Sequence, residues 1–168
     1  DQVDMTYNTP VDQLDVVRRL PNVELHEAVT AQTGVMRMRT TEAPFDNIHV
    51  RKAVQLCADR AQMLEIAHRN AGQEAADYHV CQIHPEYFDL PGPTRNIEEA
   101  KAELAKAGYE DGISFEIVVG DTQGPWETAQ CEALAAQCRP AGIDLRINKM
   151  PANQYWEVWD KAPFGLTS

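Results

Sequence analysis

The sequence lacks the short motifs that cradle phosphate groups or assemble a hydrolase centre. It contains no Gly-x-Gly-x-x-Gly run, no Walker loop, no Gly-x-Ser-x-Gly elbow and no His-Glu-x-x-His helix. A run of about 18 apolar residues, the length needed to cross a bilayer, is also missing. We therefore expect a protein that is not an enzyme, that needs no cofactor, and that has no membrane-spanning segment.

Basic residues are few, and the cysteines form no metal-binding pair. The chain has 15 Lys and Arg against 26 Asp and Glu, a net charge of −11 that would repel nucleic acid. None of the 4 cysteines stands in a Cys-x-x-Cys pair. We expect small buried apolar side chains, with Cys131 and Cys138 on one helix face; a bridge between Cys57 and Cys81 stays open.

What the chain does contain is two successive units in which an alanine-rich helix stops at a glycine and a strand follows. They occupy residues 97–119 and 126–147. Asn96 is placed to cap the first helix, and Pro140 must end the second. Alternating helices and strands predict an α/β fold with a central mixed sheet flanked by helices. With 168 residues, we expect residues 1–168 to form one lobe.

The first third of the chain predicts strands joined by a hairpin. Residues 23–29 alternate apolar and polar side chains, and residues 35–39 alternate apolar and basic ones after Thr33-Gly34. Thr9 is expected to cap a helix that begins at Pro10. The further strands expected are residues 3–7, 113–119, 143–147 and 164–167, and the further helices follow residue 47 and Pro151.

Residues 71–95 are rich in Gly and Pro and predict a long irregular loop, a feature that is often functional. The loop contains His79, Cys81 and His84, whose imidazole and thiol groups suit zinc, nickel or copper. No fourth ligand is evident in the sequence. Chance proximity in the chain and a metal-binding module therefore both stay open.

Two arginines stand out on the predicted strand of residues 35–39. Arg37 and Arg39 fall on one side of it, where they can pair with Glu24 or His26 on a neighbouring strand. Arg39 also stands at the strand's carboxyl end, where ligands bind in open α/β sheets. A guanidinium there is able to clamp a carboxylate through two hydrogen bonds.

Two further segments allow more than one interpretation. Tyr155, Trp156 and Trp159 lie on one predicted helix, and aromatic residues at this spacing pack against a core or stack on a ligand. Residues 120–124 precede a helix N-terminus that can hold an anion, although their sequence matches no known phosphate cradle.

Several motifs in a fixed order resemble the bacterial extracellular solute-binding proteins of family 5, the dipeptide, oligopeptide and nickel receptors of ABC importers. The similarity runs over about the whole chain. Its opening Asp-Gln-Val-Asp resembles the start of the family pattern. The other motifs are Pro44-Phe45-Asp46, Val50-Arg51-Lys52-Ala53, Asp59-Arg60, Ala107-Gly108-Tyr109 with Gly112, and Ala141-Gly142-Ile143.

This resemblance implies one lobe of a two-lobed periplasmic receptor that closes on a solute and docks on membrane permease subunits. The chain would be most of the C-terminal lobe and would face an N-terminal lobe of the same protein. A Gly-Trp pair and a ligand-binding acid of the family would come after Ser168. Where many members have Asn after the strand, this chain has Arg39, which puts a neutral ligand in doubt.

We accordingly predict a substrate-binding component that captures a peptide or a related amino-acid-derived solute. The residues expected to contact it are Tyr7, Asn8, Arg39 and Thr40. The alternative is a transition-metal or metal-chelate module built on His79, Cys81 and His84. The identity of the solute and the oligomeric state are not encoded in any motif.

Overall fold

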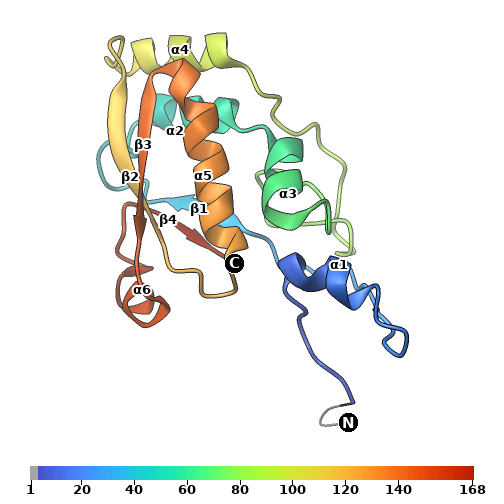
Figure 1. Ribbon diagram of the computed structural model, residues 1–168. Helices are drawn as coiled ribbons and strands as arrows, with labels where there is room; N and C mark the ends of the chain where they lie inside the picture. The colour runs from blue at the N-terminus through green and yellow to red at the C-terminus, as the bar shows by residue number, and fades with distance from the viewer. Residues whose placement is uncertain (1–3) are drawn as a thin grey trace.

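The computed structural model describes residues 4–168, in which helices pack against one four-stranded sheet (Figure 1). The strand order is β1-β4-β2-β3; β2 runs parallel to β3 and β4, and β1 runs antiparallel to β4. The predicted α/β class with a mixed sheet is therefore confirmed. The elements are η1 (Val11–Gln13), α1 (Leu14–Val17), β1 (Val35–Met38), α2 (Ile48–Cys57), α3 (Arg60–His68), α4 (Ile97–Lys106), β2 (Ile113–Val119), α5 (Trp126–Cys138), η2 (Arg139–Ala141), β3 (Ile143–Lys149), α6 (Ala152–Val158) and β4 (Phe164–Thr167).

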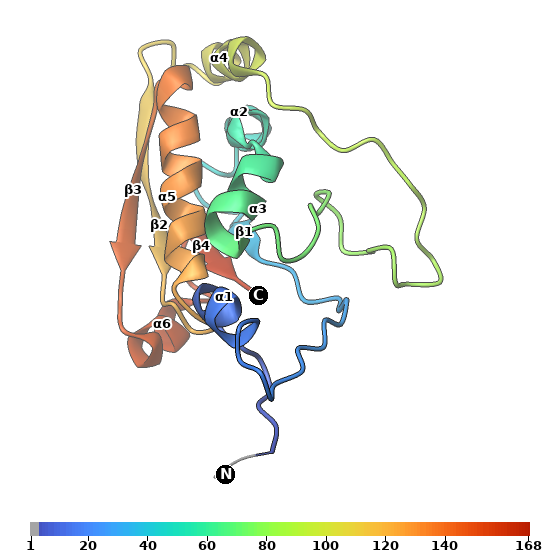
Figure 2. The same ribbon diagram turned by 45° about the vertical axis from the view of Figure 1, so that its right-hand side comes forward.

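The two faces of the sheet differ in character because side chains alternate along each strand. Phe115, Ile117 and Leu145 point into the main core beneath the helices. Their neighbours Ser114 and Asp144 are exposed and hydrogen-bonded to each other on the opposite face. Figure 2 shows α2 to α5 on one side of β2 and β3, with α6 at the lower end of β3. We call the second, largely polar face the open face.

Phe45 anchors the core although it comes from the loop between β1 and α2. It is 1% exposed, and its ring lies 5.0 Å from Phe115 and 5.2 Å from Phe164, measured between ring centroids. The cysteines of the helices also lie in this core. Cys57 and Cys138 are fully buried, and all four cysteines are free.

The local signals of the second half of the chain are confirmed. The Asn96 side chain accepts a hydrogen bond from the Glu99 amide and so caps α4. Gly108, just beyond α4, has a φ of 84°, a left-handed conformation that favours glycine. Helix α5 ends at Cys138, and the short helix η2 and Gly142 connect it to β3.

The predictions for the first third of the chain are largely wrong. Residues 4–7 and 23–29 form no strand, and the first part of the expected strand 3–7 lies outside the described residues. Strand β1 pairs with β4 instead of forming a hairpin with residues 23–29. Pro10, rather than Thr9, precedes the short helical turn. The physical reason is packing, because none of the described residues before Phe45 is buried. The alternating apolar side chains of residues 23–29 therefore have no core to pack against.

The segment between α3 and α4 is long and irregular. No helix or strand occurs in residues 71–95, and Figure 2 draws this segment as a wide excursion from the body. Cys81 lies here, whereas Cys57 is enclosed in the core beside α5, so the structure does not form the Cys57–Cys81 bridge left open above. No helix in residues 4–168 has the length and apolar character of a membrane span.

Candidate functional site

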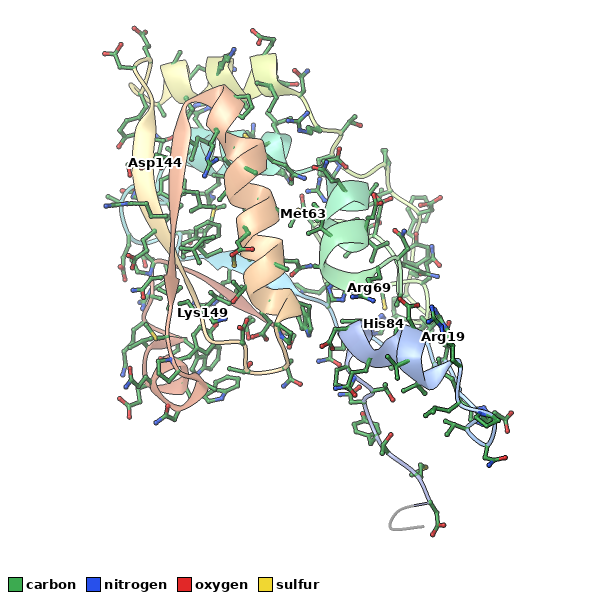
Figure 3. The ribbon with its side chains drawn as sticks, viewed as in Figure 1. Arg19, Met63, Arg69, His84, Asp144 and Lys149 are labelled. Atoms are coloured by element: carbon green, nitrogen blue, oxygen red, sulfur yellow. The ribbon has the colours of Figure 1, made fainter. Side chains whose placement is uncertain are left out.

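The carboxyl ends of β2, β3 and β4 share one edge of the sheet. Val119, the last residue of β2, lies opposite Lys149, the last residue of β3. Figure 3 places Lys149 at the lower end of β3 and Asp144 toward its upper end. The chain leaves β2 through α5 to reach β3, then returns through α6 to β4 on the other side of β2. Such a reversal creates the crevice where ligands bind in open α/β sheets.

The turn after β2 is filled by two carboxylates of the chain itself. Asp121 Oδ1 accepts hydrogen bonds from the Thr128 amide (2.9 Å) and hydroxyl (2.6 Å). Glu127 accepts from the Thr122 amide (2.6 Å) and hydroxyl (3.1 Å). These bonds occupy the Thr122 and Thr128 amides with carboxylates of the chain itself. This disfavours the anion site that the sequence allowed at residues 120–124.

The two carboxylates of this turn differ in their electrostatic surroundings. Burial raises the pKa of Asp121, but hydrogen bonds from Lys149 and Thr128 outweigh it, and the pKa falls below its usual range. Lys149 Nζ lies 2.5 Å from Asp121 Oδ2. Burial dominates at Glu127, which is 1% exposed, and raises its pKa despite the Thr122 bonds. The edge thus carries one paired carboxylate and one enclosed carboxylate.

An aromatic and imidazole pair flanks this turn, and sequence reasoning missed it. The rings of Trp126 and His68 lie 4.7 Å apart, and burial lowers the pKa of His68. Gln130 Nε2 lies 3.5 Å from His68 Nε2, while Gln130 Oε1 is enclosed with no hydrogen-bond partner in the described residues. A tryptophan directly after Gly124-Pro125, at a strand-to-helix turn, was the signal available.

Helix α6 closes the same edge from the open face. Tyr155 is 1% exposed, and its hydroxyl donates a hydrogen bond to the Leu166 carbonyl of β4. It packs with Val118 and Ala162 in a second, smaller core. Core packing and ligand stacking were the two roles considered for Tyr155, Trp156 and Trp159. Tyr155 has the packing role. Trp156 remains 48% exposed and Trp159 38% exposed.

Arg39 lies at the opposite edge of the sheet. Because β1 is antiparallel to β4, the carboxyl end of β1 meets the amino end of β4, and the Arg39 amide donates to the Pro163 carbonyl. The Arg39 guanidinium donates to the carbonyls of Asp160 (2.9 Å) and Lys161 (3.1 Å). It also pairs with Glu42 at 3.0 Å. The side chain therefore fastens the loop that leads from α6 into β4.

The other predicted contacts are spread over the molecule. Thr40 is exposed beside Arg39, and Tyr7 is 89% exposed in the segment that leads to α1. Asn8, the next residue, has a φ of 59°. Figures 1 and 2 both draw this N-terminal segment leading away from the sheet, so the structure does not bring the two pairs together. Their role in binding stays a prediction.

The expected pairing of the β1 arginines is wrong. His26 Nε2 lies 3.5 Å from Glu24 of its own segment, since that segment forms no strand beside β1. The strand that does lie beside β1 is β4, which places Gly165 opposite Arg37. Arg37 therefore has a different environment, on the open face near α6.

The proposed metal ligands are only partly assembled. Cys81 Sγ lies 3.2 Å from His84 Nδ1, which also accepts a hydrogen bond from the Cys81 amide at 3.0 Å. Residues 4–168 contain no group of three or more His, Cys, Asp or Glu side chains arranged to hold a metal ion. His79 is thus not brought into a common site with the other two.

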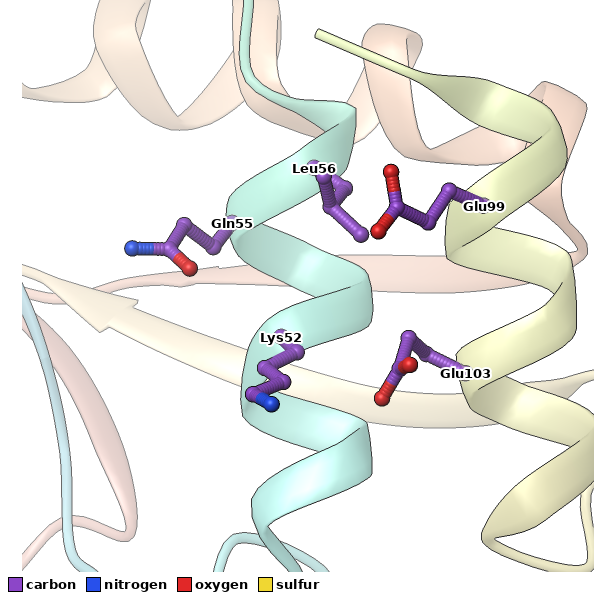
Figure 4. Close-up of a pocket in the computed structure, with 5 residues that line it drawn as sticks. All are labelled: Lys52, Gln55, Leu56, Glu99 and Glu103. Atoms are coloured by element: carbon purple, nitrogen blue, oxygen red, sulfur yellow. The ribbon is translucent and has the colours of Figure 1, made fainter. Parts of the chain in front are cut away.

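A shallow hollow lies between α2 and α4 (Figure 4). It encloses about 190 Å³, less than the roughly 300–1,000 Å³ of pockets for small-molecule ligands. Its lining includes Glu103, whose side chain is 8% exposed and lies between His49 Nδ1 (2.6 Å) and Lys106 Nζ (2.5 Å). The charged side chains here join two helices, and the hollow is a junction rather than a binding site.

We expect the Glu103 junction to make stability fall at acid pH. Hydrogen bonds from Lys106 and His49 lower the pKa of Glu103 from 4.5 to about 2. A depressed folded pKa stabilises the fold above the unfolded pKa, so this contribution is lost as pH falls from 4.5 toward 2. Glu103→Gln should cost on the order of 1 kcal/mol at pH 7, because its partners are partly exposed.

Urea unfolding at pH 7 and pH 3 measures this effect. The difference in unfolding free energy between the wild type and Glu103→Gln should narrow at pH 3, because the unfolded wild type takes up a proton there that the folded state largely does not. Glu98→Gln is the matched control, since Glu98 lies on the same helix with its side chain 82% exposed. An equal gap at both pH values would contradict the assignment.

The sequence is similar to known bacterial solute-binding proteins. A family model described as bacterial extracellular solute-binding proteins, family 5 Middle, matches residues 1–168. The dipeptide-binding protein of Escherichia coli (strain K12) is 23% identical over 146 residues, which cover 85% of this chain and 27% of that protein.

Two solved structures share the fold. DppA from Helicobacter pylori, in complex with the peptide STSA, has a TM-score of 0.82 at 17% identity and covers 95% of this chain and 31% of its own. NikA from Staphylococcus aureus, in complex with Ni(L-His)2, has a TM-score of 0.81 at 19% identity, with 94% and 34% covered. The predicted fold, an α/β fold shared with periplasmic binding proteins, is confirmed. The chain spans about a third or less of the length of these proteins.

Proposed function

This chain belongs to family 5 of the bacterial extracellular solute-binding proteins, as its motifs indicated, and we propose that it forms part of a receptor that delivers a small solute to an ABC permease. The match of the family model over residues 1–168 carries this proposal. The receptor would work outside the cytoplasmic membrane, in the periplasm, and would bind its solute without transforming it.

The solute class we propose is a peptide or a related amino-acid-derived compound. Relatives with the names of dipeptide-binding and oligopeptide-binding proteins support it, as does the peptide held by DppA. The metal alternative finds less support here, because the three side chains proposed for it do not converge in residues 4–168.

Capture would take place between two lobes, of which residues 1–168 supply one. Two hollows in residues 4–168 have volumes of about 190 and 300 Å³, and both are open to solvent. Ligand pockets enclose most of the surface of their ligand, so a second wall has to close over the solute. We propose that an N-terminal lobe of the same protein provides that wall.

Two sets of residues are candidates for the contacts within this lobe. The first is the predicted set of Tyr7, Asn8, Arg39 and Thr40, which remains to be tested. The second lies on the carboxyl edge of the sheet, where Trp126 and Lys149 flank the turn after β2. The edge location favours the second set, since ligands of open α/β sheets bind beyond the carboxyl ends of the strands.

A thermal-shift screen tests the function. We expect dipeptides such as Met-Leu to raise the melting temperature of the complete receptor that contains this lobe, by linkage of binding to folding. The isolated 168-residue chain should respond weakly, because half of the pocket wall is missing. Ni(L-His)2 serves as the second ligand class. Tight peptide binding by the isolated chain, or no peptide response of the receptor, would contradict the proposal.

A further inference from the structure

Arg37 carries donors that the described part of the protein leaves unused. Its Nε and Nη2 atoms are enclosed, and neither has a hydrogen-bond partner among residues 4–168. An enclosed donor without an acceptor costs free energy, and more so when the group is charged. Arg37 lies opposite Gly165 of β4, a position that α6 covers, since a Cβ at Gly165 would lie 3.8 Å from the Tyr155 hydroxyl.

Within residues 4–168, the interaction that offsets this cost for Arg37 is aromatic. Its guanidinium carbon lies 5.6 Å from the ring centroid of Trp159, within the range of a cation–π contact. Trp159 in turn stacks edge-on against Trp156, with centroids 6.2 Å apart. Both indoles keep more than a third of their surface exposed. The result is an arginine with free donors beside a solvent-facing pair of indoles.

This cluster lies next to the edge described above. Gly165 is paired with Val118, the residue before the end of β2, so Arg37 lies one strand away from the turn after β2. Tyr155, next to Trp156 on α6, covers Gly120 at the start of that turn. The cluster therefore lies on the open face beside the carboxyl edge.

We propose that Arg37, Trp156 and Trp159 form a subsite for the carboxylate of an amino-acid-derived solute with a flat apolar part. The proposal rests on the proposed receptor function and names the chemistry that the receptor selects. Once the neighbouring side chains that enclose Nε and Nη2 move aside, the Arg37 fork would donate two hydrogen bonds to the carboxylate, and the indoles would cover the flat part.

Charge favours this occupant over a neutral one. The chain carries a net charge of −11, which disfavours anions over most of its surface, so an anion needs a local cation to bind. Arg39, two residues along, already donates to two carbonyls and pairs with Glu42. Arg37 has no such internal partner for its enclosed donors, which makes it the better carboxylate ligand of the two.

Two small probes of equal shape test the subsite. Indole-3-acetate carries the carboxylate and indole-3-acetamide replaces it by a neutral amide. We expect the 168-residue chain to bind the acetate in the millimolar range, at least about tenfold more tightly than the amide, from the loss of a charged hydrogen bond. Isothermal titration calorimetry measures both affinities.

Variants assign the effect to Arg37. Arg37→Gln should abolish the preference for the acetate while leaving the melting temperature equal or higher, because unpaired donors are removed. Arg37→Lys should keep part of the preference, since it retains the charge without the fork. Arg146→Gln is the matched control, an exposed arginine on β3 with the same change of charge.

The outcomes separate this proposal from the receptor function. Equal affinity for both probes, no binding of either, or a preference that survives Arg37→Gln would overturn the subsite. A peptide response of the receptor alongside any of these results would leave the function standing. An Arg37-dependent preference in a receptor that ignores peptides would instead support the subsite and overturn the peptide assignment.

Discussion

Replacing Phe45 by alanine is expected to lower the free energy of unfolding by about 3–5 kcal/mol, the largest effect of any single substitution considered for this chain. The ring is 1% exposed and contacts Phe115 and Phe164 from β2 and β4. Its removal leaves a cavity where the loop after β1 meets the sheet, and the loop has no other buried residue to hold it. Domains of this kind are stable by only about 5–15 kcal/mol, so much of the total would be lost.

Urea unfolding followed by circular dichroism measures the change. Phe88→Ala is the matched control, since Phe88 lies in the irregular segment with 72% of its surface exposed. That control should shift the midpoint little. A Phe45→Ala variant as stable as the control would show that the three rings do not form the centre of the core.

The sequence predicts elements well where a local signal and a buried face coincide. Asn96 caps α4 and Gly108 follows its end, and residues 113–119 alternate into a core that exists. The same alternation in residues 23–29 misleads, because nothing in the described residues covers that segment. Periodicity reports which side chains share a face, and the burial of that face is decided by the rest of the fold.

The candidate site shows a second limit of the sequence. Arg39 follows a strand, and the rule for ligand sites refers to the carboxyl ends of parallel strands. The direction of β1 relative to β4 is set by long-range pairing, and its antiparallel course moves Arg39 to the other edge. The enclosed donors of Arg37 likewise depend on α6 crossing the open face, a contact between residues more than a hundred positions apart. Neither fact has a local sequence signal.

Gly120→Ala is expected to destabilise the fold by about 1–3 kcal/mol and to disturb the carboxyl edge at the same time. A Cβ at Gly120 would lie 2.5 Å from both Cβ and Cγ of Tyr155. These atoms are at the root of the side chain, so a rotamer change does not relieve the clash, and α6 itself has to move. The shift would strain the hydrogen bond from Tyr155 to Leu166, which ties α6 to β4.

Gly92→Ala provides the control for Gly120→Ala, because nothing lies within 4 Å of a Cβ at that position. Urea unfolding should separate the two variants, and tryptophan emission should change only in Gly120→Ala, since Trp156 and Trp159 move with α6.

The affinity for indole-3-acetate should also fall in Gly120→Ala, because Arg37 stays on β1 while Trp159 moves away from it. Normal stability of Gly120→Ala would mean that α6 packs less closely on the end of β2 than this contact requires. Unchanged stability together with unchanged affinity would show that α6 does not contribute to the carboxyl edge.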